Sequence, residues 1–400
     1  MPSRDITVSS NFISLPSNLV YISEKIQGAT SKVEVNSYFP SKDKLKGVVW
    51  LFQGSGGFGK YWILRTEESE MMDLLVANDY AVITVDNEEV TQVKDLNKDG
   101  SLSFDYSADT LSNLDLINIK LIKNYFIALG KFNPSTPQIA MGFSSGGGFA
   151  EVVAAVYNWS ASLSHNTGVV DYTADKSKVP HYQNNSYHDD GPNVGSEGNA
   201  KAIANMKKYN DRGIKNQMIL QLPQPLHAER FARIDSVSVS QSTTAFNYLK
   251  QIGLLDNSNY LIKDPSPIQM DYEAHPDKYP ALKAFSVSFV NEVFIQLKAV
   301  YTDHLFRSDY NGSALKFINE VLKITTPVKD EAKNLRTIFY PNPANDYIQF
   351  EKPLQYMIFN SGGTLLKSGF EKSANVSDLP SGVYFLKTKM NTEKVVISRH

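Results

Sequence analysis

The pentapeptide Gly142-Phe143-Ser144-Ser145-Gly146 constrains the fold of this chain more than any other segment. It lies between an apolar run, residues 138–141, and an alanine-rich run that extends past Ala155. A G-x-S-x-G pattern between a short strand and a helix predicts a sharp turn that holds the serine hydroxyl above a sheet. Glycine suits such a turn because it has no Cβ to collide with neighbouring backbone. Ser144 is therefore the predicted nucleophile, at the positive end of the following helix.

A serine hydroxyl reacts only when a base takes its proton and an acid holds that base, in the expected chain order serine, acid, histidine. His227 follows the strand-like run 217–222 and a Pro-Gln-Pro loop, and catalytic groups of open α/β sheets lie where strands end. We therefore predict His227 as the base. His181, His188 and His304 are the competing residues. His188 is next to Asp189 and Asp190, the candidate acids. His304 lies in a helical run and is expected to be a packed or surface residue.

The orienting acid is expected between the serine and the histidine. A short strand candidate, residues 179–182, is followed by the polar segment 184–194, which contains Asp189 and Asp190. We prefer Asp190 because Val194 stands a few residues after it, and Asp189 is kept as the alternative. Either carboxylate would hold the imidazole in the tautomer that can accept the serine proton.

Backbone donors for an oxyanion are expected after an earlier strand. The apolar run 47–52 leads into the glycine-rich segment 53–59, and glycines let N–H groups approach a developing charge. We predict the N–H of Ser55 or Gly56, together with that of Ser145. The aromatic residues Phe58, Tyr61 and Trp62 stand beside this loop as candidate substrate contacts, with a core role as the alternative. A phosphate loop is excluded, because Lys60 is followed by tyrosine instead of serine or threonine.

Strand-like and helix-like runs alternate along the first part of the chain. Residues 80–85 form a buried strand pattern, and apolar residues at three- and four-residue steps from 111 to 129 predict a helix. Alternating elements predict an α/β fold with a mainly parallel sheet covered by helices. The pattern from about 238 to 325 is almost wholly helical, and we expect it to complete the cover or to shape a substrate rim.

Composition limits the function classes further. The 400 residues favour two or three domains, and a net charge of −2 argues against a nucleic-acid partner. The absence of cysteine excludes disulfides and thiol chemistry. No apolar run approaches the roughly 20 residues that a membrane span needs. Residues 1–5 lack the apolar centre of a signal peptide, so we expect that a leader was removed before this start.

One loop resembles the opening of a calcium-binding loop. Oxygen-bearing side chains alternate before and after Gly100, as in an EF-hand-type loop. The predicted ligands are Asp95, Asn97, Asp99, Ser101 and Asp105. The twelfth position, where a carboxylate is expected, is Tyr106, so a solvated acidic turn is the alternative. Any calcium would be structural, and no other cofactor is expected.

Over roughly residues 40–250 the chain resembles the α/β-hydrolase superfamily, through the segments around Gly54, Ser144, Asp190 and His227. The order and spacing are similar to those of its secreted esterases and polyester depolymerases. The resemblance implies hydrolysis of carboxylic esters through an acyl-enzyme. Polyesters and aromatic esters are the candidate substrates. Gln53-Gly54 stands where that family usually has His-Gly, which removes a residue that commonly braces the loop. A peptidase of the same fold and an inactive surface-binding module are the alternatives.

The composition changes after about residue 325. Residues 326–336 are polar and charged, as in a linker, and residues 337–400 contain short strand patterns separated by turns, which predict a small β-sandwich. Residues 1–325 would then form the catalytic domain. The last segment resembles the C-terminal sorting domain of the type IX secretion system, through Tyr340-Pro341-Asn342-Pro343, Gly362-Gly363 and 379–384. This resemblance implies contact with the secretion machinery and export across an outer membrane, with a carbohydrate- or protein-binding sandwich as the alternative.

Overall fold

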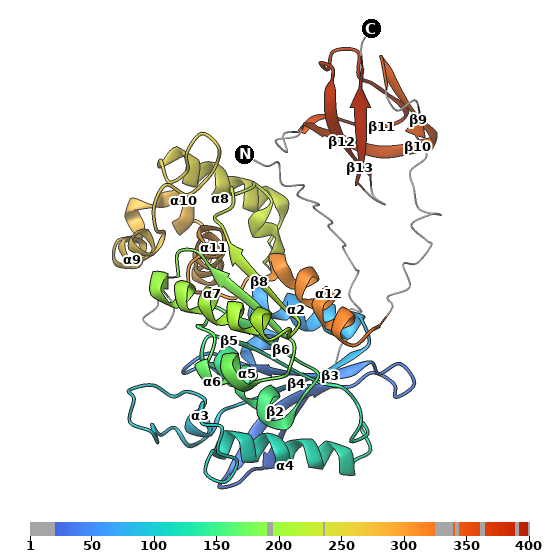
Figure 1. The fold of residues 1–400 in the computed structure, drawn as a ribbon. Coiled ribbons are helices and arrows are strands. Elements are labelled where there is room, and N and C mark those ends of the chain that lie inside the picture. The colour runs from blue at the N-terminus through green and yellow to red at the C-terminus, as the bar shows by residue number, and fades with distance from the viewer. Residues whose placement is uncertain are drawn as a thin grey trace. The chain divides into compact units, whose positions relative to one another are not determined.

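The computed structural model describes residues 21–189, 195–234, 237–324, 339–340, 344–360, 365–388 and 392–398. The described residues belong to two compact units, of which one ends at Ile324 and the other contains the C-terminal strands (Figure 1). The predicted linker, residues 326–336, lies outside the described residues.

An eight-stranded sheet forms the centre of the larger unit, in the order β1-β2-β4-β3-β5-β6-β7-β8. The strands are β1 Ile22–Gln27, β2 Lys32–Tyr38, β3 Gly47–Phe52, β4 Tyr80–Val85, β5 Gln138–Phe143, β6 Ala161–His165, β7 His181–Ser186 and β8 Asn216–Gln221. β2 pairs antiparallel with both β1 and β4, and every other pairing in the sheet is parallel. The predicted α/β fold with a mainly parallel sheet covered by helices is confirmed.

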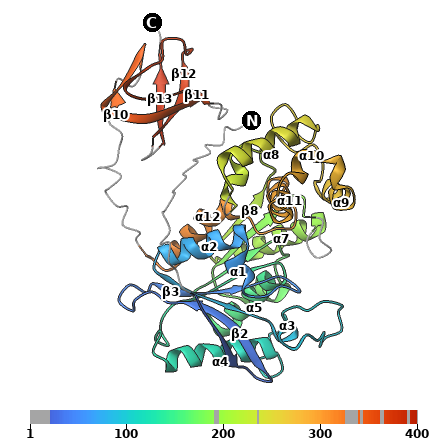
Figure 2. The same ribbon diagram turned by 180° about the vertical axis from the view of Figure 1, so that it is seen from behind.

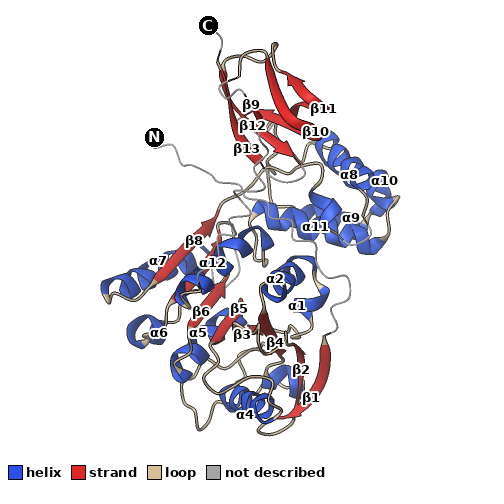
Figure 3. Cartoon of the chain, turned by 90° about the vertical axis from the view of Figure 1, so that its right-hand side faces the viewer, coloured by secondary structure: helices blue, strands red, loops and turns tan. Residues whose placement is uncertain are grey.

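Both faces of the sheet are buried at the strands from β3 to β7, as their sequences require. In β3, Val48 and Trp50 belong to one hydrophobic core, and Val49 and Leu51 belong to another, because successive side chains of a strand point to opposite faces. Helices α4 (Leu114–Ala128) and α5 (Ser145–Tyr157) pack on the first core. Helices α2 (Thr66–Ala77) and α12 (Asn311–Val321) pack on the second. Figure 3 shows the strands lying between these helical layers.

Between β8 and α12 the chain builds a group of helices with a hydrophobic core of its own. We call residues 222–301 the helical insertion, and Figures 1 and 2 show its helices gathered together beyond the end of β8. Its elements are η1 Arg230–Arg233, α8 Val239–Gln251, α9 Ser266–Ala274, η2 Pro276–Lys278, α10 Pro280–Lys283 and α11 Val287–Tyr301. This confirms the helical pattern expected from residue 238 onward, and it also separates β8 from the residues that follow α11.

Five further elements complete the larger unit. They are α1 Tyr61–Leu64, α3 Glu88–Gln92, α6 Asp171–Lys176, α7 Gly195–Asp211 and η3 Ser308–Tyr310. Within the described ranges, no helix combines the length and the apolar character needed to cross a bilayer.

The smaller unit is all β. It contains β9 Phe339–Tyr340, β10 Tyr347–Asn360, β11 Leu365–Asn375, β12 Gly382–Thr388 and β13 Thr392–Ile397. These strands pair in the order β11-β10-β12-β13, with β9 beside β10, so their hydrogen bonds join them into one antiparallel sheet. Its core includes Ile348, Ile358, Leu386 and Val395. A separate all-β C-terminal region is therefore confirmed.

A buried carboxylate ties α5 to the sheet. Glu151 is 1% exposed, and its oxygens accept hydrogen bonds from Thr173 Oγ1 at 2.6 Å, Val170 N at 3.0 Å and Ser164 Oγ at 3.1 Å. Burial raises the pKa of Glu151 to about 8, and the three donors only partly offset this effect. The carboxyl group is therefore largely protonated in the folded protein at neutral pH.

This pKa predicts how stability changes with pH. Unfolding lowers the pKa of Glu151 to about 4.3, so the native state binds the extra proton, and its stabilising contribution is lost as the pH rises toward about 8. We expect the melting temperature of the wild type to fall more than that of Glu151→Gln between pH 6.5 and 8.5. Differential scanning calorimetry at the two pH values measures both changes. Equal falls in the two proteins would contradict this assignment.

Candidate active site

The turn after β5 has the shape predicted for a nucleophile. Ser144 directly follows β5, precedes α5 and adopts φ 54° and ψ −124°. A residue with a side chain pays about 1–3 kcal/mol for such a conformation, so the neighbouring packing must hold it. A Cβ on Gly142 would lie 2.0 Å from Gly146 O, and a Cβ on Gly146 would lie 2.3 Å from Phe52 O. Glycine is thus required on both sides of Ser144.

Two side chains from distant segments complete a hydrogen-bonded row with Ser144. His304 Nε2 lies 2.9 Å from Ser144 Oγ, and His304 Nδ1 lies 2.7 Å from Asp189 Oδ2. Asp189 is 1% exposed, while 29% of the His304 side chain is exposed. The imidazole therefore connects a buried carboxylate with a hydroxyl at the carboxyl end of strand β5.

The carboxylate decides which nitrogen of His304 carries the proton. An ionised carboxylate only accepts hydrogen bonds, so Nδ1 donates to Asp189 in the neutral imidazole. Nε2 then presents a lone pair to the hydroxyl of Ser144. Because Ser144 caps the positive end of α5, negative charge at its oxygen is also favoured by the helix. This arrangement can remove the proton of Ser144 during attack on an electrophile.

The prediction of His227 as the base is wrong, because His304 occupies the position beside Ser144 Oγ. His227 is exposed and lies near the start of the helical insertion. The helical insertion follows β8 in the chain, and residues 302–308, which we call the His304 loop, come after it beside Ser144. Asp189, the alternative acid, is bonded to the imidazole in place of the preferred Asp190. Asp190 itself lies outside the described residues.

The His304 loop is fastened to the loop that carries Asp189. His188 N donates to Thr302 O at 3.0 Å, and His188 Nδ1 lies 2.8 Å from Tyr301 O. The rings of His188 and Tyr301 stack with centroids 4.3 Å apart. His188, a competing base in the sequence, thus braces the two loops. Farther along, Asn166 Nδ2 donates to Leu305 O at 2.8 Å.

Two predicted oxyanion donors are available, and one is not. The N–H groups of Ser55 and Ser145 make no hydrogen bond to a described residue, whereas Gly56 N donates to Leu102 O at 2.7 Å. The choice of Gly56 is therefore wrong. A Cβ on Gly54 would lie 3.0 Å from Ser144 Cβ, which places this loop against the nucleophile. Ser55 and Ser145 remain the predicted donors.

Gln53 braces the same loop although it replaces the expected histidine. The residue is 2% exposed, and its Oε1 accepts a hydrogen bond from Gly54 N at 2.9 Å. Its Nε2 lies 3.5 Å from Glu68 Oε1. Burial raises the pKa of the Glu68 carboxyl group to about 7. The glutamine therefore supplies the support that its substitution for histidine had placed in doubt.

The three aromatic residues beside this loop have different surroundings. Phe58 is 38% exposed, and its ring packs edge-on against Tyr61 with centroids 5.6 Å apart. Trp62 is fully buried and packs against Phe306 of the His304 loop, with ring centroids 5.0 Å apart. Trp62 is a core residue, so its prediction as a substrate contact is wrong. Phe58 and Tyr61 remain predicted contacts.

A cavity of about 180 Å³ borders the His304 loop. Its lining comes from the start of α2, from α11 and from the residues that follow His304: Arg65, Thr66, Glu67, Glu68, Glu292, Ile295, Leu305 and Phe306. Three glutamates and one arginine thus line this cavity together with apolar residues.

The acidic loop that resembles a calcium site uses its side chains on its own backbone. Asp95 accepts hydrogen bonds from Lys98 N at 2.6 Å and Gly100 N at 3.0 Å. Asp99 Oδ1 accepts from Ser101 N at 2.8 Å. Among the described residues, no group of three or more histidine, aspartate or glutamate side chains is placed to hold a metal ion. Calcium binding through Asp95, Asn97, Asp99, Ser101 and Asp105 stays a prediction from the sequence.

Residues 338–399 match the family described as a secretion system C-terminal sorting domain. This confirms the prediction for the C-terminal region, and it means that the protein is exported by the type IX secretion system to the cell surface or beyond. No curated protein matches the chain.

Several solved structures are similar to about half of the chain. One is an α/β serine hydrolase without lid from Xanthomonas campestris, 13% identical, covering 52% of this chain and 84% of that chain, with a TM-score of 0.35. Another is a ferulic acid esterase, 12% identical, covering 52% of this chain and 90% of that chain, with a TM-score of 0.38. An acylaminoacyl peptidase from Pyrococcus horikoshii is 11% identical and covers 50% of this chain and 36% of that chain, with a TM-score of 0.38.

Proposed function

We propose that the protein is an exported serine hydrolase that cleaves carboxylic esters through an acyl-enzyme. Ser144 Oγ attacks the ester carbonyl carbon while His304 Nε2 takes the hydroxyl proton. Asp189 keeps the proton on Nδ1 and stabilises the imidazolium that forms. The N–H groups of Ser55 and Ser145 donate to the carbonyl oxygen as it becomes negative.

The remaining steps use the same groups. The tetrahedral intermediate collapses, the bond to the leaving oxygen breaks, and His304 gives its proton to that oxygen, so an alcohol departs. Water then attacks the acyl carbon, with His304 again accepting a proton. The second intermediate releases the carboxylic acid and returns the proton to Ser144 Oγ.

The observation that carries this proposal is the row of hydrogen bonds from Ser144 Oγ through His304 to Asp189, at 2.9 and 2.7 Å. Hydrogen-bond contact between a nucleophile and a base that a buried carboxylate orients is the arrangement that activates serine. The strained backbone of Ser144 supports the same proposal, because strain of this kind gathers at functional sites.

The substrate preference is proposed from fewer residues. Phe58 and Tyr61 offer an aromatic edge beside the oxyanion loop, which suits an apolar or aromatic acyl group. Because the protein is exported, a polymeric ester such as a polyester is a substrate that it could meet outside the cell. A peptidase and an inactive binding protein are the competing proposals.

A comparison of nitrophenyl esters with peptide anilides tests the function. We expect release of nitrophenol in a burst that equals the enzyme concentration, followed by slower turnover, with peptide anilides cleaved far more slowly. Ser144→Ala should abolish the burst. Faster cleavage of the anilides would favour a peptidase, and release of nitrophenol no faster than in Ser144→Ala with every ester would favour an inactive binding protein.

A further inference from the structure

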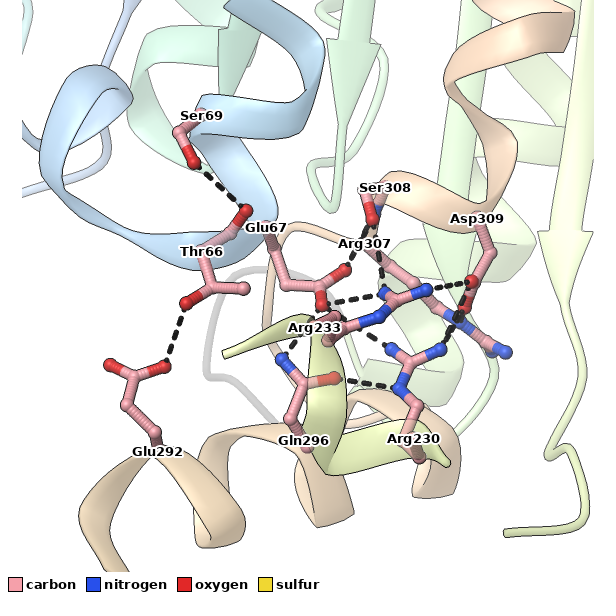
Figure 4. Close-up of polar contacts among 10 residues, drawn as sticks. All are labelled: Thr66, Glu67, Ser69, Arg230, Arg233, Glu292, Gln296, Arg307, Ser308 and Asp309. Atoms are coloured by element: carbon pink, nitrogen blue, oxygen red, sulfur yellow. Dashed lines mark hydrogen bonds and ion pairs between the residues drawn. The ribbon is translucent and has the colours of Figure 1, made fainter. Parts of the chain in front are cut away.

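A buried carboxylate lies where the helical insertion meets the start of α2 (Figure 4). Glu67, in the first turn of α2, is 2% exposed. Its Oε1 lies 2.9 Å from Arg233 Nη1 and 2.8 Å from Gln296 Nε2. Its Oε2 accepts hydrogen bonds from both the backbone N and the Oγ of Ser308, each at 2.8 Å. One side chain thus contacts the insertion and the end of the His304 loop.

The same carboxylate joins both ends of the insertion. Arg233 belongs to η1 near its start, and Gln296 belongs to α11 at its end. Arg230 Nη2 lies 3.4 Å from Glu67, and Arg230 also binds Asp309 at 2.8 Å. Burial opposes ionisation, but Arg230 and Arg233 outweigh it and lower the pKa of Glu67. Glu67 is therefore an anion within a buried charged cluster.

Glu67 is the main side-chain contact of the last residue of the His304 loop. The first residue, Thr302, is held by His188, and Leu305 is held by Asn166. Ser308, the last residue, makes two hydrogen bonds to Glu67 at 2.8 Å and one longer contact with Arg233 Nη1 at 3.2 Å. A shift of Ser308 would reach His304 through the backbone of residues 305–307, against the restraint that Asn166 places on Leu305.

We propose that Glu67 is a positioning residue for the base, which transmits the docking of the helical insertion to His304 through Ser308. The inference rests on the proposed function, in which His304 is the base. Loss of the negative charge of Glu67 would leave the more exposed Asp309 as the carboxylate beside Arg230 and Arg233, and removing one member of a buried charge cluster destabilises its surroundings. A displacement of about 1 Å at a reacting group costs about 100-fold in rate.

Glu67→Gln tests the proposal in the full-length protein. We expect kcat for a nitrophenyl ester, normalised to the number of sites titrated by a fluorophosphonate, to fall about 10- to 100-fold, with KM changed less than about twofold. A titration run to completion counts the reactive sites and so removes any loss caused by unfolded molecules. Glu67→Asp, which keeps the charge and so protects the fold, should lower kcat about 10-fold because the shorter side chain withdraws from Ser308.

Asp271→Asn is the matched control. Asp271 also holds several donors, including Lys278 Nζ at 2.9 Å and Tyr279 Oη at 2.7 Å, but all of these lie within the insertion. Its loss should weaken the insertion locally and leave kcat per titrated site unchanged. A fall in kcat as large as that of Glu67→Gln would indicate that any damage to the insertion acts on the site, and would overturn the specific role of Glu67.

A double substitution separates positioning from a purely structural role. If Glu67 acts through His304, Glu67→Gln should cause no further loss of residual activity when His304→Ala is already present. Multiplying losses, or unchanged kcat in both Glu67 variants, would overturn this inference and leave the proposed function standing. Full activity of His304→Ala alone would instead reject the proposed base.

Discussion

Replacing His304 with alanine is expected to lower kcat for ester hydrolysis by about 10⁴- to 10⁶-fold, because a serine without its base is a poor nucleophile. The distance of 2.9 Å between His304 Nε2 and Ser144 Oγ is the basis of this expectation. Stopped-flow and steady-state measurements with a nitrophenyl ester give kcat for each variant, and circular dichroism shows whether the fold is kept.

His227→Ala is the matched control for that loss. His227 is exposed, and its substitution should leave kcat within about twofold of the wild type, as for most surface changes away from a site. The opposite pattern, with a large loss in His227→Ala and near-normal activity in His304→Ala, would contradict the assignment of the base.

Asp189→Asn is expected to lower kcat by about 10⁴-fold with little change in KM. An amide at this position can donate to Nδ1 of His304, which would favour the wrong tautomer and leave Nε2 protonated toward Ser144. The pair is close, at 2.7 Å, and Asp189 is buried, so solvent cannot replace the carboxylate easily.

The neighbouring substitution Asp190→Asn discriminates between the two candidate acids. We expect a loss of less than about 10-fold, because His304 Nδ1 already has Asp189 as its partner. Measuring kcat for both variants with the same ester shows which aspartate orients His304. Equal losses would contradict a single orienting acid, and a larger loss in Asp190→Asn would reassign the role.

The parts of the site that depend on local sequence could be predicted. Ser144 and its glycines follow from steric limits within five residues, and the buried strands follow from short apolar runs. The parallel sheet follows from the alternation of strands and helices. Gly56 was a reasonable oxyanion donor in the sequence, but its N–H bonds to Leu102 O, a contact that local patterns cannot reveal.

The base could not be located in this way, because its position depends on a long insertion. Residues 302–307 contain neither glycine nor proline, so no turn signal interrupts the helical pattern around His304. One feature of the sequence does favour His304 as the base. It follows the acid in the chain, and it stands in the short segment between two helical patterns. The choice of Asp189 likewise depends on the contact of His188 with Thr302, which lies 114 residues away.

The most direct test of Ser144 as the nucleophile and His304 as its base is labelling by a fluorophosphonate, followed by mass spectrometry of the intact protein and its peptides. We predict one phosphonyl group per chain, bonded to Ser144 Oγ, with the reaction lost in Ser144→Ala, slowed at least about 1000-fold in His304→Ala and unchanged in His227→Ala. Labelling of Ser144 at the wild-type rate in His304→Ala, or of another serine in the wild type, would contradict it.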